Sequence, residues 1–591
     1  MGSQAGHGDE LGAAPGPDLG LPDRDSHLAG FASGGEWDAC SPSASLVLAL
    51  EGASGPEWRC AGATRDEMFG LLRQWQALEA RAVAGKLGIL RALIREDDEP
   101  LPGGGYHGDL PEGWTKSLTH EVAAALSMPV VSADRLMSVA WDLEGRLPGV
   151  GGLLADGALT FAKARAVDEA LQALAVEDAT AAEAMILPDL PGKTYGQVVK
   201  LAVQAAITVD PESATRRRED AEQNRSRVTM FREESGAAGL SGRDLPTDQT
   251  LAAHASVCAR AQEYAESGVF PEGTRMDQYR VAAYLDLLNG AAAHVRIASG
   301  LLPGGGTADD SEGAPGVNDE PSAEHDPDGE DPVTTPPRLA DLVVPLATLL
   351  GLAERSGIGH GLGPLDPDLC RELAIAATDS PHSRLCVTVT DPDGIAIGHG
   401  CARTSRRGNR SVDDDPDRTV TLPARLNLTV TAARLAELAN TTGPPGRGSW
   451  AFARDTDVGP PDGYGTWTLT LPNGRSLVVE LRPMPTFECD HRYESHAYQP
   501  NDTLRHLVQI RDGDCTFPTC SRPARESDFE HATPYDKGGR TCACNAGARS
   551  RGCHRVKQSP GWNVTQPKPG WHQWITPSGR AYIQGPKRYP A

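Results

Sequence analysis

The sequence lacks the features of a secreted or membrane protein. Residues 1–20 contain neither a basic segment nor an apolar run, so we expect no signal peptide. The best apolar stretch, residues 339–352, includes Asp341 and Pro345 and is shorter than the roughly 20 apolar residues that a bilayer crossing needs. These absences predict a cytoplasmic protein with reduced thiols and no membrane partner.

A net positive charge is also missing. The chain carries 56 Lys and Arg against 80 Asp and Glu, a formal net charge of -24, which by itself argues against nucleic-acid binding. The charge is uneven, because residues 501–591 contain 14 Lys and Arg against 7 Asp and Glu. This segment therefore carries +7 and the other 500 residues carry -31. The sequence thus combines a basic C-terminal module with an acidic body.

Apolar residues make up only 39% of the chain, while 65 Gly and 46 Pro indicate linkers and loops. A chain of 591 residues is expected to hold several domains. We predict a disordered lead-in and a mainly α-helical domain with a small hairpin, followed by a linker, a mixed α+β region and a C-terminal module. The predicted bounds are 1–62, 63–300, 301–337, 338–500 and 501–591, respectively.

Local patterns predict several elements within these domains. Apolar residues at three-to-four spacing predict one long helix through Met68–Ile94. Val228–Phe231 is predicted to be a strand that the following glycines turn back as a hairpin. Residues 339–352 are predicted to be helical, and residues 466–471 and 476–481 to form a hairpin.

The predicted linker is strongly acidic. Residues 303–337 contain ten Asp and Glu and no Lys or Arg. Such a segment cannot bury enough apolar surface to fold by itself. Because its charge repels DNA, we expect it to act as an intramolecular competitor for the basic C-terminal module.

Five of the 12 cysteines lie within residues 515–553. This clustering, without a secretory segment, favours metal binding over disulfides. A structural zinc ion needs four soft ligands, commonly supplied as two close pairs. Cys515 and Cys520 form the natural first pair. The second pair is predicted to be Cys553 with Cys544, or with Cys542 as the alternative.

Acid–base side chains lie between and beside these cysteines. Glu530-His531, Asn545 and His554 are predicted to meet at one point, if a hairpin around His531 packs on a following helix. A divalent ion there, with a neutral histidine nearby, is what metal-assisted phosphodiester hydrolysis requires. Four basic residues are expected to bind the DNA backbone. They are Arg549, Arg551, Arg555 and Lys557.

The stretch resembles HNH endonucleases, with His531, Asn545 and His554 at the positions that name the motif. Four segments carry this resemblance, and they cover residues 505–520, 528–539, 544–562 and 571–582. The larger frame resembles actinobacterial HNH proteins of the 13E12-repeat type, which carry an N-terminal helical domain of unknown function (domain of unknown function 222). Residues 155–167, 227–231 and 240–246 match that domain more loosely.

The resemblance implies a zinc-stabilised ββα-metal module that cleaves DNA. His531 would be the general base, while Asp528, Glu530 and His554 would bind a catalytic Mg²⁺, Mn²⁺ or Ni²⁺ ion. Asn545 would be a further ligand or would position a loop.

Two positions depart from the family pattern. Glu530 stands where the family usually has Asp, and Ser550 stands where many members have a zinc-binding cysteine. The alternative function is a zinc-stabilised DNA-binding module that does not cut.

Overall fold

The computed structural model describes residues 28–97, 113–210, 212–303, 339–404, 422–439, 449–455 and 464–591. The chain divides into two compact units. The first contains residues 1–217, 390–399 and 483–589, and the second contains residues 218–389, 400–482 and 590–591. Within the described residues, no single helix has both the length and the hydropathy of a membrane span, although helices Lys116–Ala125 and Val130–Gly145 meet that test jointly as a bent pair.

The first described segment is folded, which corrects the disordered lead-in predicted for residues 1–62; residues 1–27 lie outside the described residues. Helix α2 (Ala44–Ser54) begins at Ser43, whose hydroxyl accepts from the Leu46 N–H. Phe31, Leu46 and Leu50 are buried in one cluster with Leu71 of the next helix. The segment is ordered because its few apolar side chains pack on a neighbouring element.

Helix α3 (Arg65–Glu96) confirms the long amphipathic helix, and a capping box of Thr64 and Glu67 fixes its start. Its buried face, including Leu87, Leu90 and Ile94, enters the largest helical core. Six further helices pack around that core. They are α4 (Lys116–Ala125), α5 (Val130–Gly145), α6 (Pro148–Ala155), α7 (Phe161–Leu171), α8 (Val176–Ile186) and α9 (Tyr195–Val209).

The hairpin predicted near residue 230 is present, with β1 (Arg227–Arg232) antiparallel to β2 (Ala238–Arg243). Helix α10 (Ser213–Asp220) precedes it, and α11 (Thr247–Ser267), α12 (Met276–Leu288) and α13 (Ala293–Ser299) follow. The last three share a small core in which Asp286 is buried. Asp286 accepts hydrogen bonds from Arg296 and from the Tyr264 hydroxyl. The predicted domain 63–300 is therefore divided, because residues 218–300 belong to the second unit.

The middle region is built on a nine-stranded sheet. The strands are β3 (Ala340–Pro345), β4 (Gly357–Gly359), β5 (Gly363–Leu365), β6 (Arg384–Thr390), β7 (Ala396–Thr404), β8 (Ala424–Thr431), β9 (Ala451–Arg454), β10 (Gly465–Thr470) and β11 (Ser476–Pro483). Their order is β5-β4-β3-β8-β6-β7-β11-β10-β9. Helices α14 (Leu346–Leu349), α15 (Pro367–Asp379) and α16 (Ala432–Ala439) accompany the sheet.

The prediction of a helix over residues 339–352 is wrong for most of that stretch. Residues 340–345 form β3, which pairs in parallel with β8, and only Leu346–Leu349 is helical. Burial of Leu342 and Val344 on a strand outweighs the helix-like spacing of the leucines. The predicted hairpin at residues 466–481 is confirmed as β10 and β11. Of the predicted linker, residues 304–337 lie outside the described residues.

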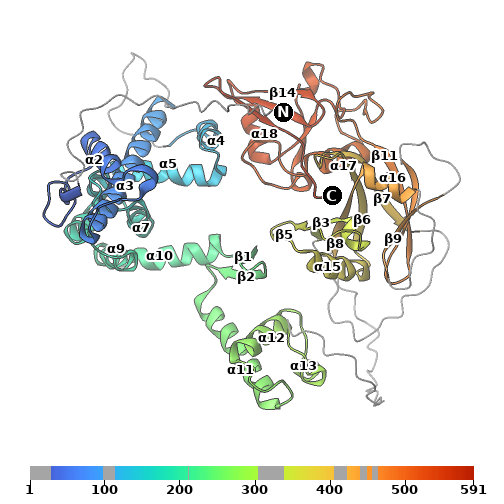
Figure 1. The fold of residues 1–591 in the computed structure, drawn as a ribbon, viewed down its shortest axis with the longest axis horizontal. Helices are drawn as coiled ribbons and strands as arrows, with labels where there is room; N and C mark the ends of the chain where they lie inside the picture. Colours follow the sequence, from blue (N-terminus) through green and yellow to red (C-terminus); the bar gives the residue numbers. More distant parts are fainter. Residues whose placement is uncertain are drawn as a thin grey trace, which may run out of the picture. The chain divides into compact units, whose positions relative to one another are not determined.

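The C-terminal module combines small helices with short strands (Figure 1). Its elements are α17 (Asp502–Asp512), β12 (Asp528–His531), β13 (Ala546–Arg549), α18 (Arg551–Lys557), β14 (Asn563–Lys568), β15 (Trp571–Ile575) and β16 (Ala581–Gln584). Phe517, Trp562 and Trp574 are buried in its core. The buried guanidinium of Arg511 donates to the Ala543 and Ala546 carbonyls, which ties the loop before β13 to α17.

Candidate active site and metal centres

Strands β12 and β13 and helix α18 form the frame of the candidate active site. The strands pair antiparallel, and α18 packs against both. One residue, Ser550, separates β13 from α18, and its hydroxyl accepts from the Cys553 N–H to cap the helix. Because side chains alternate along a strand, Asp528 and Glu530 share one face of β12 and His531 lies on the other.

Asp528 and Glu530 hold His554 of α18 between them. Its Nδ1 lies 2.8 Å from Asp528 Oδ2, and its Nε2 lies 3.0 Å from Glu530 Oε2. The hydrogen bond with Glu530, followed by that with Asp528, raises the pKa of His554, although burial opposes the shift. The structure thus brings together three of the four side chains predicted to bind the catalytic ion.

Glu530 also forms a buried ion pair. Lys557 Nζ lies 2.7 Å from Glu530 Oε1, and both side chains are less than a tenth exposed. Burial alone would raise the pKa of Glu530, but the hydrogen bonds from His554 and Lys557 lower it to about 2. The Glu530 carboxylate is therefore ionised at neutral pH and is available as a ligand.

Arg549 corrects part of the predicted DNA-binding set. Its side chain is fully buried, donates to the His531 carbonyl at 3.3 Å and lies over the Trp574 ring. A guanidinium enclosed in the module cannot reach a phosphate. Lys557 is held in its buried ion pair with Glu530 and is likewise withdrawn from a phosphate. Arg551 and Arg555, in contrast, are exposed on α18.

His531 lies on the opposite face of β12 from the carboxylates. Its Nε2 is 2.9 Å from the Thr541 hydroxyl, and its ring stacks on Tyr498 with centroids 5.5 Å apart. Burial lowers the pKa of His531 below its ordinary value. The imidazole is therefore neutral at pH 7, which is the form that can accept a proton.

Asn545 positions a loop. Its Oδ1 accepts from the Thr533 N–H at 2.7 Å, and its Nδ2 donates to the carbonyls of Thr533 and Arg540. These bonds close the loop between β12 and β13 and engage both the oxygen and the nitrogen of the amide. Of the two roles predicted for Asn545, the geometry favours loop positioning over metal binding.

Cys515, Cys520 and Cys553 have sulfur atoms that all lie within 4.8 Å of one another. The Ser550 N–H donates to Cys515 Sγ at 3.2 Å, an arrangement that suits a thiolate ligand. Hydrogen bonds from Cys515 and Cys553 lower the pKa of Cys520 to about 2. These three soft donors can hold a metal ion such as zinc.

No local pattern in the sequence indicated that His120, on α4, would approach this three-cysteine cluster. Its Nδ1 lies 2.7 Å from the Lys116 carbonyl, which can only accept, so Nδ1 carries the proton. The neutral ring then presents the lone pair of Nε2, which lies 3.8 Å from Cys553 Sγ. Burial lowers the pKa of His120 and so favours this neutral form.

The predicted fourth zinc ligand, Cys544 or Cys542, is not brought to the three-cysteine cluster. Both cysteines instead join Cys489 and His491 in a separate group whose ligand atoms lie within 4.8 Å of one another. The sequence contained a signal for this group, because Cys489-x-His491 and Cys542-x-Cys544 have the same spacing.

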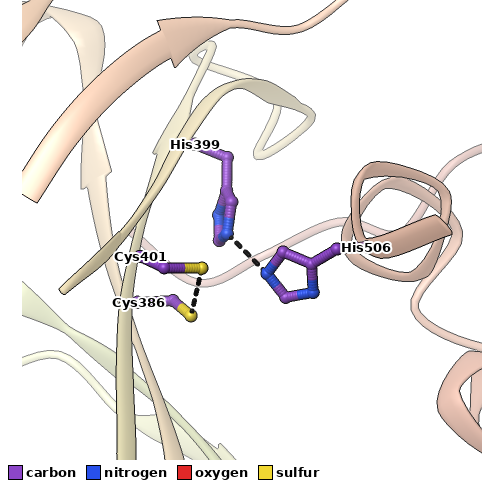
Figure 2. A group of neighbouring side chains, drawn as sticks. All are labelled: Cys386, His399, Cys401 and His506. Atoms are coloured by element: carbon purple, nitrogen blue, oxygen red, sulfur yellow. Dashed lines mark hydrogen bonds between the residues drawn. The ribbon is translucent and has the colours of Figure 1, made fainter. Parts of the chain in front are cut away.

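Two further pairs of side chains are of the types that can hold a metal ion (Figure 2). Cys386 of β6 and Cys401 of β7 have sulfur atoms 3.2 Å apart. His399 of β7 and His506 of α17 face each other with their Nε2 atoms 2.9 Å apart. Two imidazole nitrogens at that distance cannot both carry a proton, so one of them presents a lone pair. No sequence pattern predicted a role for any of the four.

A cavity of about 360 Å³ lies beside the carboxylate–histidine set. Asp528 and His554 line it together with three arginines, Arg505, Arg525 and Arg551. Arg551 also lies 3.1 Å from Asp528 Oδ1. An anionic ligand in this cavity would meet positive side chains next to the ionised carboxylates.

A comparison with known protein families finds a match in the N-terminal, mainly helical part of the chain. Residues 57–298 match the family model described as Domain of unknown function (DUF222). The chain contains a DUF222 domain. This domain runs from just before α3 to the end of α13, and it confirms the N-terminal part of the resemblance. No curated protein and no solved structure matches the chain. The DUF222 match leaves the C-terminal module outside its bounds.

Proposed function

We propose that the C-terminal module is a metal-dependent endonuclease of the HNH type, which hydrolyses phosphodiester bonds in DNA. The observation that carries this proposal is the β12–β13 hairpin with α18 packed on it. That frame places an ionised Glu530 and His554 next to each other, and a neutral His531 one residue along the same strand. Metal-assisted hydrolysis needs a carboxylate, a metal-binding imidazole and a separate base in one small region.

His531 serves as the general base. The Thr541 hydroxyl donates to the Tyr498 carbonyl, so its oxygen accepts from His531 Nε2–H. This hydrogen-bond chain leaves Nδ1 with the lone pair that takes a proton from the attacking water. Stacking on Tyr498 fixes the plane of the ring.

Asp528, Glu530 and His554 would hold the divalent ion. The donors fit, since two carboxylate oxygens and an imidazole nitrogen are ligands that Mg²⁺, Mn²⁺ and Ni²⁺ accept. His554 must release its proton to serve, because both ring nitrogens now face carboxylates. When bound, the ion would polarise the phosphate and stabilise the leaving oxygen.

Arginines on and beside α18 supply the DNA-binding surface. Arg551 and Arg555 project from α18, and Arg505 and Arg525 line the adjacent cavity. Residues 501–591 carry 14 basic against 7 acidic side chains, which favours a polyanion despite the overall charge of -24.

The test is a plasmid-nicking assay with the full-length protein. We expect supercoiled DNA to be nicked with Mg²⁺, Mn²⁺ or Ni²⁺ and to stay intact with EDTA. His531→Asn keeps a polar group near Thr541 but removes the base, so we expect nicking at least about 100-fold slower. His360→Asn, at an exposed histidine of the second unit, is the matched control and should cut like the parent.

DNA affinity, measured in parallel, separates the two functions. The base variant should bind DNA as the parent does, because His531 makes no phosphate contact in this proposal. Nicking by His531→Asn at the parental rate would refute the role of His531. Binding by the parent without metal-dependent nicking would instead support the DNA-binding module that does not cut.

A further inference from the structure

The group formed by Cys489, His491, Cys542 and Cys544 has a defined geometry. Cys489 Sγ and His491 Nδ1 each lie 3.4 Å from Cys542 Sγ, and Cys544 Sγ lies 3.9 Å from His491 Nδ1. The two contributing segments are each three residues long and lie about 50 residues apart in the sequence. All four side chains belong to the first unit.

We propose that these four residues form a zinc site that is separate from the three-cysteine cluster. Three sulfurs and one imidazole are a common structural zinc set. In a tetrahedron with Zn–S of about 2.3 Å and Zn–N of about 2.0 Å, neighbouring ligand atoms lie roughly 3.5–3.8 Å apart. The observed separations of 3.4–3.9 Å match that geometry. They are far longer than a disulfide bond of about 2.05 Å, and all three cysteines are unbridged.

The backbone at His491 supports a ligand role. Its φ is 59°, in the left-handed region that residues other than Gly seldom adopt. Such a conformation persists only where surrounding interactions impose it. Two contacts around the turn help to do so. They are the bridge from Ser495 to Thr541 and the ion pair of Glu494 with Arg540, 3.0 Å apart. A zinc bond would add a third constraint, through the side chain of His491 itself.

The site also bears on the candidate active site, a consequence that rests on the proposed nuclease function. Cys542 directly follows Thr541, whose hydroxyl orients His531. The segment that begins at Cys489 continues to Tyr498, whose ring stacks on His531 and whose carbonyl accepts from Thr541. The ion would thus link the segment that contains Tyr498 to the segment that contains Thr541, and these are the two segments that orient His531.

The test is zinc content, measured by elemental analysis on the full-length protein without DNA. Cys489→Ser and Cys544→Ser should each contain about one zinc per chain less than the parent. Cys489→His should retain the ion, since imidazole can replace a thiolate at such a site. Cys40→Ser, at a cysteine outside every group described above, is the matched control and should keep the parental zinc content.

Equal zinc content in the parent and in both serine variants would overturn the proposal. An intact mass showing a Cys489–Cys542 disulfide in protein purified under reducing conditions would overturn it as well. If the serine variants aggregate, Cys489→His decides the question, because a soluble variant without the ion contradicts the site. These readouts need no cleavage, so a parent that does not cut DNA would leave this result unaffected.

Discussion

The pKa values of two histidines in the candidate active site are shifted in opposite directions because their neighbours differ. His531 is buried against Thr541 and Tyr498, and this burial lowers its pKa. His554 lies between two carboxylates, which raise its pKa. One environment therefore favours a neutral base and the other a protonated imidazole. In the proposed function, metal binding must compete with the proton on His554.

The raised pKa of His554 predicts a pH-dependent stability. A group with a raised folded pKa stabilises the fold fully below its unfolded pKa of about 6.5, and this contribution is lost as the pH rises through the folded value. His554→Gln removes the titration. Calorimetry without added divalent ions should therefore show a parental advantage in melting temperature that is largest near about pH 5.5 and smaller near about pH 9. An advantage that does not change with pH would contradict the assignment.

Burial separates the roles of three arginines that lie within seven residues of one another. Arg549→Ala should destabilise the module by roughly 3 kcal/mol, because it opens a cavity beside Trp574 and weakens the surroundings of the buried Glu530. Arg551→Ala and Arg555→Ala should leave stability nearly unchanged. Each should instead reduce the slope of log affinity for DNA against log salt by about one. An unchanged slope in both variants would show that α18 does not contact DNA.

At the scale of elements, the sequence correctly predicted those helices and hairpins that depend on the local spacing of apolar and turn residues. The helix α3 follows from its apolar periodicity, and the hairpin β10–β11 from the turn at Gly474, whose φ is 79°. Cys542 and Cys544 could not be paired correctly with other cysteines from spacing alone. Their partners Cys489 and His491 lie about 50 residues upstream, and the spacing that the two pairs share does not show that they meet in the fold.

The contact of α4 with the three-cysteine cluster predicts that His120 supports metal binding there. Among the described residues, three cysteines form this cluster, and the Nε2 lone pair of His120 faces Cys553 Sγ at 3.8 Å. His120→Ala should therefore lower zinc affinity at this cluster at least about tenfold in a chelator competition. His120→Cys should restore it. His294→Ala, at an exposed histidine of α13, is the control. Equal zinc release from His120→Ala and the parent would contradict this role.

At the scale of the whole molecule, the predicted linker does not mark the division between the two units. Segments from both halves of the chain, residues 1–217 and 483–589, belong to the first unit. Within it, Trp562 Nε1 donates to the Ser117 hydroxyl at 2.7 Å, and Ala124 enters the core around Phe517. Contacts between residues more than 400 positions apart in the sequence cannot be predicted from local periodicity. The DUF222 domain therefore shares one compact unit with the proposed nuclease module for part of its length.

The acidic segment of residues 303–337 predicts how the whole chain responds to salt. Replacing its ten Asp and Glu by Asn and Gln changes the formal net charge from -24 to -14 without altering the DUF222 domain or the C-terminal module. Because less negative charge then repels DNA, this variant should bind non-specific duplex more tightly than the parent at about 50 mM salt. The difference should shrink as salt rises, since the Debye length falls to about 8 Å at physiological ionic strength. Titration of both proteins on one duplex across a salt series checks this. Equal affinity at low salt would show that the segment does not compete with DNA for the basic module.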